Sequence, residues 1–228
     1  MLAQETRLLR PIVKPATREF VPVVPGALSG IFERMGAPLR FERNCEVFGE
    51  GEPAEYFYKV VRGAVRTYKV LSDGRRQIGA FHLPGDIFGI EAGEEHRFSA
   101  EAISQATVLV AKRRAVIAQA SRDSDVAHEL WTLTAAGLEK AQDHMMLLGR
   151  RNAQERVAAF LLEMADRGPE DAAVELPMSR QDIADYLGLT IETVSRTLTQ
   201  LEISAAIELP SSRHINLCDR AALLRLNA

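Results

Sequence analysis

Residues 178–202 hold two helix starts and a glycine turn at the spacing of a helix-turn-helix pair, which constrains the fold more than any other feature. Ser179 can cap a first helix, and Asp182 three residues later completes an Asp variant of the capping box. Gly188 suits the position after that helix, where a positive φ costs glycine little, and Thr190 can cap a second helix. This arrangement is typical of modules that place a helix in the major groove of DNA. The expected apolar faces of the two helices are Ile183, Ala184, Leu187, Val194 and Leu198.

The second helix carries three polar side chains on one stripe near its N-terminal end. Glu192, Ser195 and Arg196 are spaced i, i+3 and i+4, so they share a face. Arginine can donate to O6 and N7 of guanine together, a carboxylate can accept from N4 of cytosine, and serine can serve a base or a phosphate. We therefore predict that these residues contact base edges. The alternative is a solvated helix face with an ion pair between Glu192 and Arg196.

Residues at the two helix starts and in a C-terminal hairpin are expected to contact the DNA backbone. The run 206–217 has two short alternating apolar segments around Pro210, which predicts a β-hairpin wing. Ser179 is also a candidate regulatory position, because a negative charge there would repel DNA. The expected backbone contacts are Ser179, Arg180, Thr190, Thr193 and Arg213.

The charge of the chain sets a limit on how it can bind DNA. The whole chain has a formal charge of −3, and residues 151–228 contain eight Arg, no Lys and twelve Asp or Glu, a formal charge of −4. Few phosphates are therefore neutralised per subunit, and non-specific binding should be weak. Affinity is expected to depend on matched base contacts and on dimerisation.

Residues 39–113 consist of short β-rich runs separated by turns. The turns contain Gly49, Gly51, Gly74 and Pro84-Gly85-Asp86. Many short strands at close spacing predict a β-barrel or jelly roll. The expected strands are residues 57–63, 64–71, 77–82 and 107–112.

Residues 125–149 have the heptad pattern of a helix that packs against a second helix. Apolar or small residues recur every seven positions in two series, which gives a and d positions over about three heptads. We predict that this seam is the interface of a homodimer; the alternative is a core helix packed on its own β-domain. The expected interface residues are Trp131, Thr134, Leu138, Ala141, Met145 and Leu148.

The pattern along the chain predicts four segments. Residues 1–25 contain four prolines and suggest an extended N-terminal arm, and residues 26–120 form the β-roll. Residues 121–150 contain the dimerisation helix, and residues 151–228 form the winged helix-turn-helix domain, which begins with an amphipathic helix at 156–165. A hinge is expected near residues 149–153.

The sequence has no run of 18 apolar residues and no apolar signal-peptide core, so we expect a soluble, cytoplasmic protein with no membrane partner. Cys45 and Cys218 lie far apart in sequence and in different expected domains, which indicates ordinary thiols rather than a disulfide.

The segment Arg180–Arg196 resembles the recognition module of the CRP/FNR transcription regulators, and Glu192-x-x-Ser195-Arg196 resembles the FNR/FixK branch. The glycine punctuation around Gly63, Gly74 and 84–89 resembles the cyclic-nucleotide-binding β-roll of that family. The resemblance implies an α+β fold with a β-roll, a long dimerisation helix and a C-terminal winged helix-turn-helix. It also implies an activator that contacts RNA polymerase, binds a TTGAT-N4-ATCAA-like palindrome in double-stranded DNA, and controls low-oxygen respiration, nitrogen metabolism and nitrogen fixation.

The chain departs from the nucleotide-binding members of the family at the phosphate cassette. Those members have an acidic residue after the cassette glycine and an adjacent Arg-Ser pair; here Ile90 follows Gly89, and Phe98 separates Arg97 from Ser99. We therefore expect no cofactor, and a cyclic-nucleotide-gated regulator is the alternative. An iron–sulfur sensor needs four cysteine thiolates, which this chain lacks.

Histidine leaves two further possibilities, neither favoured. A haem sensor needs a single axial histidine, so His82 or His96 stays possible. A cupin-type metalloenzyme is the remote alternative, but it needs a closely spaced histidine set, and the five histidines of this chain are scattered. No nucleophile elbow, P-loop or dinucleotide fingerprint occurs, so we expect no enzyme.

Overall fold

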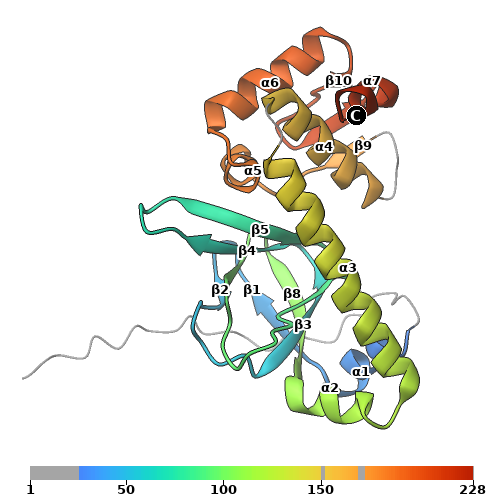
Figure 1. The fold of residues 1–228 in the computed structure, drawn as a ribbon. Helices are drawn as coiled ribbons and strands as arrows, with labels where there is room; N and C mark the ends of the chain where they lie inside the picture. The colour runs from blue at the N-terminus through green and yellow to red at the C-terminus, as the bar shows by residue number, and fades with distance from the viewer. Residues whose placement is uncertain (1–25, 150–151, 169–172, 228) are drawn as a thin grey trace, which may run out of the picture.

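The computed structural model describes residues 26–149, 152–168 and 173–227. A β-roll occupies one end, a helical domain occupies the other, and a long helix runs beside the roll and connects them (Figure 1). The predicted arm at residues 1–25 lies outside the described residues, and so does the centre of the predicted hinge at residues 150 and 151.

The β-roll consists of two four-stranded antiparallel sheets. The first has the order β1 (Ala37–Phe41), β8 (Ala106–Lys112), β3 (Tyr56–Arg62), β6 (Ile87–Phe88). The second has the order β2 (Glu46–Phe48), β7 (Ser99–Ala102), β4 (Val65–Val70), β5 (Arg76–His82). Gly63 turns the chain from β3 into β4 at φ +78, and a Cβ there would lie 2.3 Å from the carbonyl oxygen of Gln105. Only glycine fits this turn without a backbone shift.

The four predicted strands correspond to β3, β4, β5 and β8 within one or two residues. The strands β1, β2, β6 and β7 were not predicted from the sequence. They are two to five residues long, and their burial follows no clean alternation except in β7. Pairing with longer neighbours, rather than local pattern, explains their extended conformation.

Three helices form the far end of the β-roll domain: α1 (Ala27–Met35), α2 (Arg113–Ala120) and the start of α3 (Ser124–Leu148). Their buried contact contains Ile31, Phe32, Val116 and Val126. The Glu129 carboxylate accepts hydrogen bonds from the first two backbone amides of α1, at 2.6 and 2.8 Å. The carboxylate of Glu129 thus caps α1 from α3 and links the two helices.

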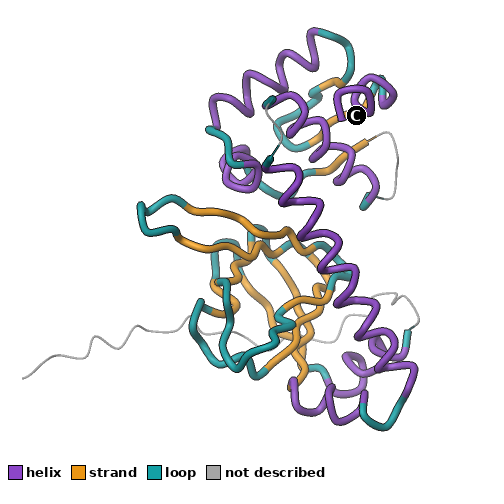
Figure 2. Tube along the Cα trace, viewed as in Figure 1, coloured by secondary structure: helices purple, strands orange, loops and turns teal. Residues whose placement is uncertain are grey.

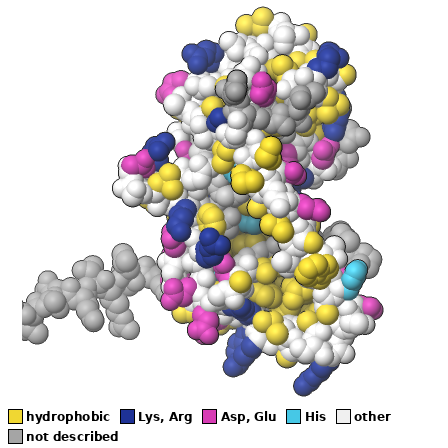
Figure 3. Space-filling model, viewed as in Figure 1, with side chains coloured by type: hydrophobic (Ala, Val, Ile, Leu, Met, Phe, Trp, Pro, Cys, Tyr) yellow, Lys and Arg dark blue, Asp and Glu magenta, His cyan; other side chains and the backbone are white. Residues whose placement is uncertain are grey.

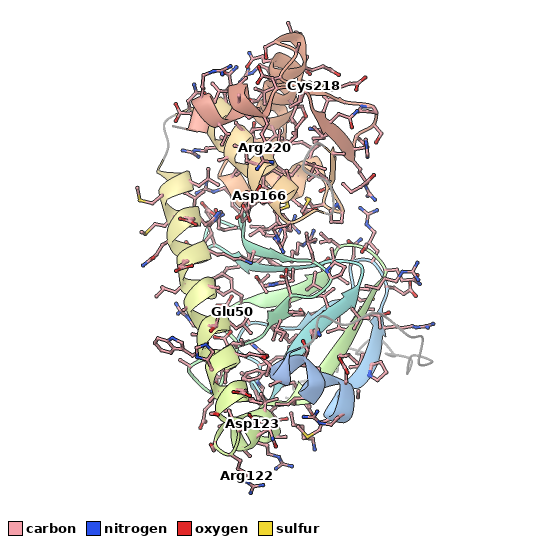
Figure 4. The ribbon with its side chains drawn as sticks, turned by 90° about the vertical axis from the view of Figure 1, so that its right-hand side faces the viewer. Glu50, Arg122, Asp123, Asp166, Cys218 and Arg220 are labelled. Atoms are coloured by element: carbon pink, nitrogen blue, oxygen red, sulfur yellow. The ribbon has the colours of Figure 1, made fainter. Side chains whose placement is uncertain are left out.

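The C-terminal domain contains α4 (Ala153–Asp166), α5 (Arg180–Leu187), α6 (Ile191–Ile203), α7 (Arg220–Asn227) and a small sheet. That sheet has the order β10 (Ile207–Glu208), β11 (His214–Leu217), β9 (Ala173–Glu175), and Figure 2 shows its strands between the helices. The antiparallel pair β10–β11 confirms the predicted wing. Arg220 of α7 forms an ion pair with Asp166 at the end of α4 (Figure 4).

These elements confirm the predicted fold class, with the long helix α3 in the predicted position. Within the described ranges, no helix combines the length and hydropathy that a membrane crossing needs. Cys45 and Cys218 are both free thiols, in agreement with the sequence prediction.

Candidate nucleic-acid interface

The helix pair α5–α6 has the two caps that the sequence predicts. The Ser179 hydroxyl accepts from the backbone N–H of Asp182 at 3.1 Å, and the Asp182 carboxylate accepts from the backbone N–H of Ser179 at 2.9 Å. Gly188 ends α5 at φ 63, and the Thr190 hydroxyl accepts from the backbone N–H of Thr193 at 3.2 Å to begin α6. The capping box and the glycine turn are therefore confirmed.

The helix α6 has one buried and one exposed face. Val194, Thr197, Leu198 and Leu201 are buried against the domain core. Glu192, Ser195 and Arg196 are all exposed on the other side. The burial pattern follows from the 3.6-residue period, which places the polar stripe opposite the apolar one. Contact of these three residues with DNA bases stays a prediction. Such contact requires exposed side chains, and all three are exposed.

The ion pair of the alternative interpretation is absent. Arg196 forms no hydrogen bond or ion pair with any residue that the structure describes, so its guanidinium keeps its donors. Glu192 instead contacts the start of its own helix: hydrogen bonds from its own backbone N–H and from Thr190 lower the pKa of its carboxyl group. Glu192 is therefore charged at neutral pH and can accept from a donor in the groove.

The predicted backbone contacts differ in their exposure. Thr190 is exposed at the beginning of α6, and Thr193 is half-buried with its hydroxyl 3.1 Å from that of Thr190. Arg213 is exposed in the turn of the wing, where the Ser211 hydroxyl accepts from its backbone N–H at 3.3 Å. Arg213 thus lies on a protruding turn, as a phosphate contact requires.

Arg180 and Ser179 are less exposed to solvent than expected for residues that contact the DNA backbone. Arg180 is half-buried, burial lowers the pKa of its guanidinium, and its Nη1 atom has no acceptor among the described residues. Ser179 is also half-buried, and its hydroxyl donates to the Asp182 carboxylate at 2.8 Å. Both side chains lie at the N-terminus of α5, where the helix dipole favours an anion.

Two acidic residues of α5 are paired with arginines of the β-roll, which sequence reasoning missed. Asp182 accepts from Arg66 of β4 at 2.5 Å and from Arg76 of β5 at 2.8 Å. Asp185 accepts from Arg76 at 2.8 Å. The formal −4 of the C-terminal segment is thus partly compensated by charges from the other domain. No local signal could have found these pairs, because more than 100 residues separate the partners.

The outer face of α3 carries an exposed apolar stripe, the α3 stripe. Trp131 is 71% exposed, Leu138 is 60% exposed and Met145 is 64% exposed. Thr134 and Ala141 are also exposed, whereas Leu148 is half-buried next to the turn at Gly188. The opposite face of α3 is the one that packs on the rest of the chain, through residues such as Val126 and Leu147. Hydrophobic side chains follow the course of α3 across the surface (Figure 3).

Aromatic side chains pack against one another inside the β-roll. Phe48 stacks on His96 at 3.6 Å between ring centroids, and Phe88 stacks on Tyr58 at 5.2 Å. Burial lowers the pKa of His96, and it lowers the pKa of His82 to about 4. Both imidazoles are therefore neutral at pH 7. These rings form one aromatic cluster with the apolar core of the roll.

The loop that follows Gly89 is held by arginine from outside the cassette. Arg113 donates to the carbonyl oxygen of Glu91 at 2.9 Å and to that of Gly93 at 2.5 Å. The exposed Arg97 uses its backbone N–H to bond the Glu91 carboxylate at 3.2 Å. The Glu91 carboxylate thus lies within this loop, where its charge would repel a phosphate group. Among the described residues, no group of three His, Cys, Asp or Glu side chains could hold a metal ion.

Two family models match the chain, and they divide it as the fold does. The model of the cyclic nucleotide-binding domain matches residues 38–123, and the model of the Crp-like helix-turn-helix domain matches residues 155–226. The first covers the β-roll with α2, and the second covers most of the C-terminal helical domain.

Relatives match across both domains. The nitrogen fixation regulation protein FixK of Azorhizobium caulinodans is 55% identical over 199 residues, which are 85% of this chain and 80% of the relative. FixK of Rhizobium meliloti is 43% identical over 213 residues, which are 93% and 96% of the two chains. The solved structure of FixK2 from Bradyrhizobium japonicum superposes with a TM-score of 0.82 at 52% identity, covering 85% of this chain and 98% of that one.

Proposed function

The chain belongs to the CRP/FNR family of transcription regulators, and we propose that it acts as a FixK-type activator whose homodimer binds a palindromic operator without a small effector. Its relatives regulate transcription and are not enzymes. The proposed domain division is a β-roll over 26–120, a dimerisation helix over 121–150 and a DNA-binding domain over 151–228. The proposed place of action is the cytoplasm.

The observation that carries this proposal is the exposed stripe of Glu192, Ser195 and Arg196 on α6, a helix whose N-terminus is capped by the Thr190 side chain. The helix pair presents this stripe outward, and the guanidinium of Arg196 has no partner among the described residues. In a helix-turn-helix module, side chains at this position reach base edges in the major groove. Arg196 would donate to guanine, and Glu192 would accept from cytosine.

Backbone contacts would fix the register of α6 in the groove. Thr190, Thr193 and Arg213 supply donors around the exposed stripe, and Ser179 lies at the N-terminus of α5. A phosphate contact by Arg180 would have to use another nitrogen of its guanidinium, because its Nη1 atom is buried. These contacts are few, as expected for a domain of net negative charge.

The α3 stripe supports a homodimer. Large apolar side chains at heptad spacing on an exposed helix face are typical of a surface that a second helix covers. A two-fold axis along paired α3 helices would direct two copies of α6 to half-sites about one helical turn apart, roughly 10–10.5 bp. The proposed operator is an imperfect palindrome of the TTGAT-N4-ATCAA type.

Effector independence is supported by the aromatic packing inside the β-roll and by the contacts of the loop after Gly89. The rings of Phe48 and His96 stack inside the roll, and Arg113 holds the loop by backbone contacts. A CRP-like regulator gated by cyclic nucleotide is the second candidate, favoured by the match of residues 38–123 to the cyclic nucleotide-binding domain.

The names of the relatives suggest the genes that are controlled. Those relatives are nitrogen fixation regulation proteins, so control of nitrogen fixation, with low-oxygen respiration, is part of the proposal. Activation would require a contact with RNA polymerase.

Binding stoichiometry on matched duplexes tests the proposal. We expect two chains per TTGAT-N4-ATCAA duplex, weaker binding to a duplex with one half-site, and the weakest binding to a scrambled duplex. Fluorescence anisotropy measures all three affinities, and analytical ultracentrifugation counts the chains. Equal affinity for the palindrome and the scrambled duplex would contradict sequence-specific recognition.

Ser179→Asp is expected to weaken operator binding by roughly tenfold, about 1.4 kcal/mol, because it adds negative charge at the N-terminus of α5 beside the DNA backbone. The new carboxylate would also face Asp182, to which the Ser179 hydroxyl donates at 2.8 Å. Ser179→Asn is the matched control, since asparagine caps a helix without a charge. Affinities of both variants are compared by anisotropy, with thermal unfolding as a check on the fold. Equal affinities for the two variants would remove Ser179 as a candidate regulatory position.

A further inference from the structure

Four charged residues join the β-roll to the first helix of the DNA-binding domain; we call them the interdomain ion cluster. Arg66 lies on β4 and Arg76 on β5, whereas Asp182 and Asp185 lie on α5. Oδ1 of Asp182 accepts from Nη1 of Arg66 at 2.5 Å and from Nη2 of Arg76 at 2.8 Å. Nε of Arg76 donates to Oδ2 of Asp185 at 2.8 Å.

Asp182 connects the cluster to the cap of α5. Its Oδ2 atom accepts from the backbone N–H and from the hydroxyl of Ser179, at 2.9 and 2.8 Å, while Oδ1 accepts from the two arginines. The carboxylate of Asp182 therefore takes part in the N-terminal cap of α5 and also binds that end of the helix to the β-roll. The side chain of Asp182 is only 5% exposed, so water screens these interactions little.

Further contacts extend the same interface along α5 and α4. Gln77 donates to the carbonyl oxygen of Tyr186 at 3.2 Å, and the ring of Phe81 lies 5.2 Å from that of Tyr186. Arg167, just after α4, donates to the carbonyl oxygen of Phe81 at 3.0 Å and forms an ion pair with Asp86. Buried apolar residues of β5, α4, α5 and α6 belong to one continuous core. The β4–β5 hairpin thus contacts α5 through charges, amide groups and rings together.

The orientation of α5 determines where α6 lies. Ile183 and Leu187 of α5 and Val194 and Leu198 of α6 are buried in the same core, and the short turn at Gly188 joins the helices. The shared core and the short turn therefore set the position of α6 relative to α5. In a dimer, the distance between the two α6 helices depends on how each pair is held against its own β-roll.

We propose that Arg66 and Arg76 are positioning residues for DNA recognition: through Asp182 and Asp185 they hold α5, and with it α6, in the orientation that a fixed half-site spacing requires. This inference rests on the proposed function, because it concerns a dimer that reads two half-sites. It assigns to the β-roll a task in DNA binding that needs no ligand. The base preference of α6 would come from Glu192, Ser195 and Arg196 and would not depend on the cluster.

Arg76 is the residue to change first. Its side chain is 25% exposed, and its loss leaves Asp182 paired with Arg66. Arg66 is nearly buried and also pairs with Glu101 at 2.9 Å, so removing it would leave Glu101 without its charged partner, would leave Asp182 with Arg76 alone, and would endanger the fold. Arg75→Gln is the matched control: it removes the same charge one residue earlier, from a side chain whose one ion pair with a described residue is to the local Asp73.

The test measures spacing selectivity in the full-length protein. Affinities are determined by anisotropy for palindromes whose TTGAT half-sites are separated by three, four, five or six base pairs. We expect the unchanged protein and Arg75→Gln to prefer the four-base spacer. In Arg76→Gln, we expect that preference over the other spacers to fall about fivefold or more, whereas the loss caused by one base change inside a half-site stays the same.

A charge-conserving variant checks that the positive charge at position 76 is responsible. Arg76→Lys keeps a cation facing Asp182 and Asp185 and is expected to recover the spacing preference that Arg76→Gln loses. If Arg76→Gln does not fold, as judged by circular dichroism, Asp185→Asn removes the Arg76–Asp185 pair from the other side and leaves both arginines on Asp182.

The outcomes separate this inference from the proposed function. An unchanged protein without preference for any palindrome would refute the proposed function. A protein that prefers the four-base spacer, together with variants of Arg76 and Asp185 that keep the same preference, would overturn the positioning role alone. A loss in Arg76→Gln that is equal at every spacing, or one that Arg76→Lys does not recover, would overturn it as well.

Discussion

Leu138→Glu is expected to convert the dimer into monomers and to weaken operator binding by about a hundredfold or more, because the two half-sites are then bound independently. Leu138 lies at the centre of the α3 stripe and is 60% exposed in the single chain. In a parallel helix pair it would face its own copy, so two glutamates would meet in a desolvated seam. The mass in solution, from light scattering, and the operator affinity, from anisotropy, are both measured.

The control for this prediction adds the same charge to the same helix. Thr132→Glu places a glutamate at an exposed position of α3 outside the a and d positions. It is expected to keep both the dimer and the affinity. A Leu138→Glu protein that stays dimeric would show that the α3 stripe is not the interface. The alternative is then a surface of α3 that another partner covers.

Arg196→Ala is expected to cost about 1–3 kcal/mol per half-site on the cognate operator, since a bidentate contact to guanine is lost. The loss should be specific: a duplex in which that guanine is already replaced should bind the variant and the unchanged protein with similar affinity. The reason for this expectation is that the guanidinium of Arg196 is exposed and has no ion-pair partner among the residues that the structure describes. Anisotropy titrations of both proteins on both duplexes give the coupling free energy between Arg196 and the guanine directly.

Arg213→Ala is the matched control for Arg196, because it removes the same type of side chain from the wing. A phosphate contact carries no sequence information, so we expect weaker binding of about equal size on every duplex and a salt slope reduced by about one. If Arg196→Ala showed this uniform pattern too, Arg196 would be a backbone contact.

The helix-turn-helix could be predicted in detail because its signals are local. Ser179 with Asp182, Gly188 and Thr190 each act within four residues of the chain, and the structure contains every one of these caps. The heptad pattern of α3 could be predicted for the same reason, because the spacing of residues within one helix is enough to show which of them share a face. Leu148, half-buried beside the turn at Gly188, shows where tertiary packing modifies the pattern.

The interdomain ion cluster could not be predicted. Arg66 and Arg76 lie on strands whose polar residues would be assigned to solvent, and Asp182 was fully explained as a capping residue. Only the folded arrangement shows that its second oxygen accepts from the β-roll. The short strands β2 and β6 were missed for a related reason, because three and two residues contain too little pattern and are extended only through their neighbours.

The central claim, that the dimer reads its operator without a small effector, is tested most directly by one titration. The purified protein, in air and without added ligand, is titrated onto a labelled TTGAT-N4-ATCAA duplex and a scrambled duplex at several salt concentrations, and again with cyclic AMP. We predict tight, selective binding to the palindrome that cyclic AMP leaves unchanged. Selective binding that arises only after addition of the nucleotide, or only after removal of oxygen, would contradict the account.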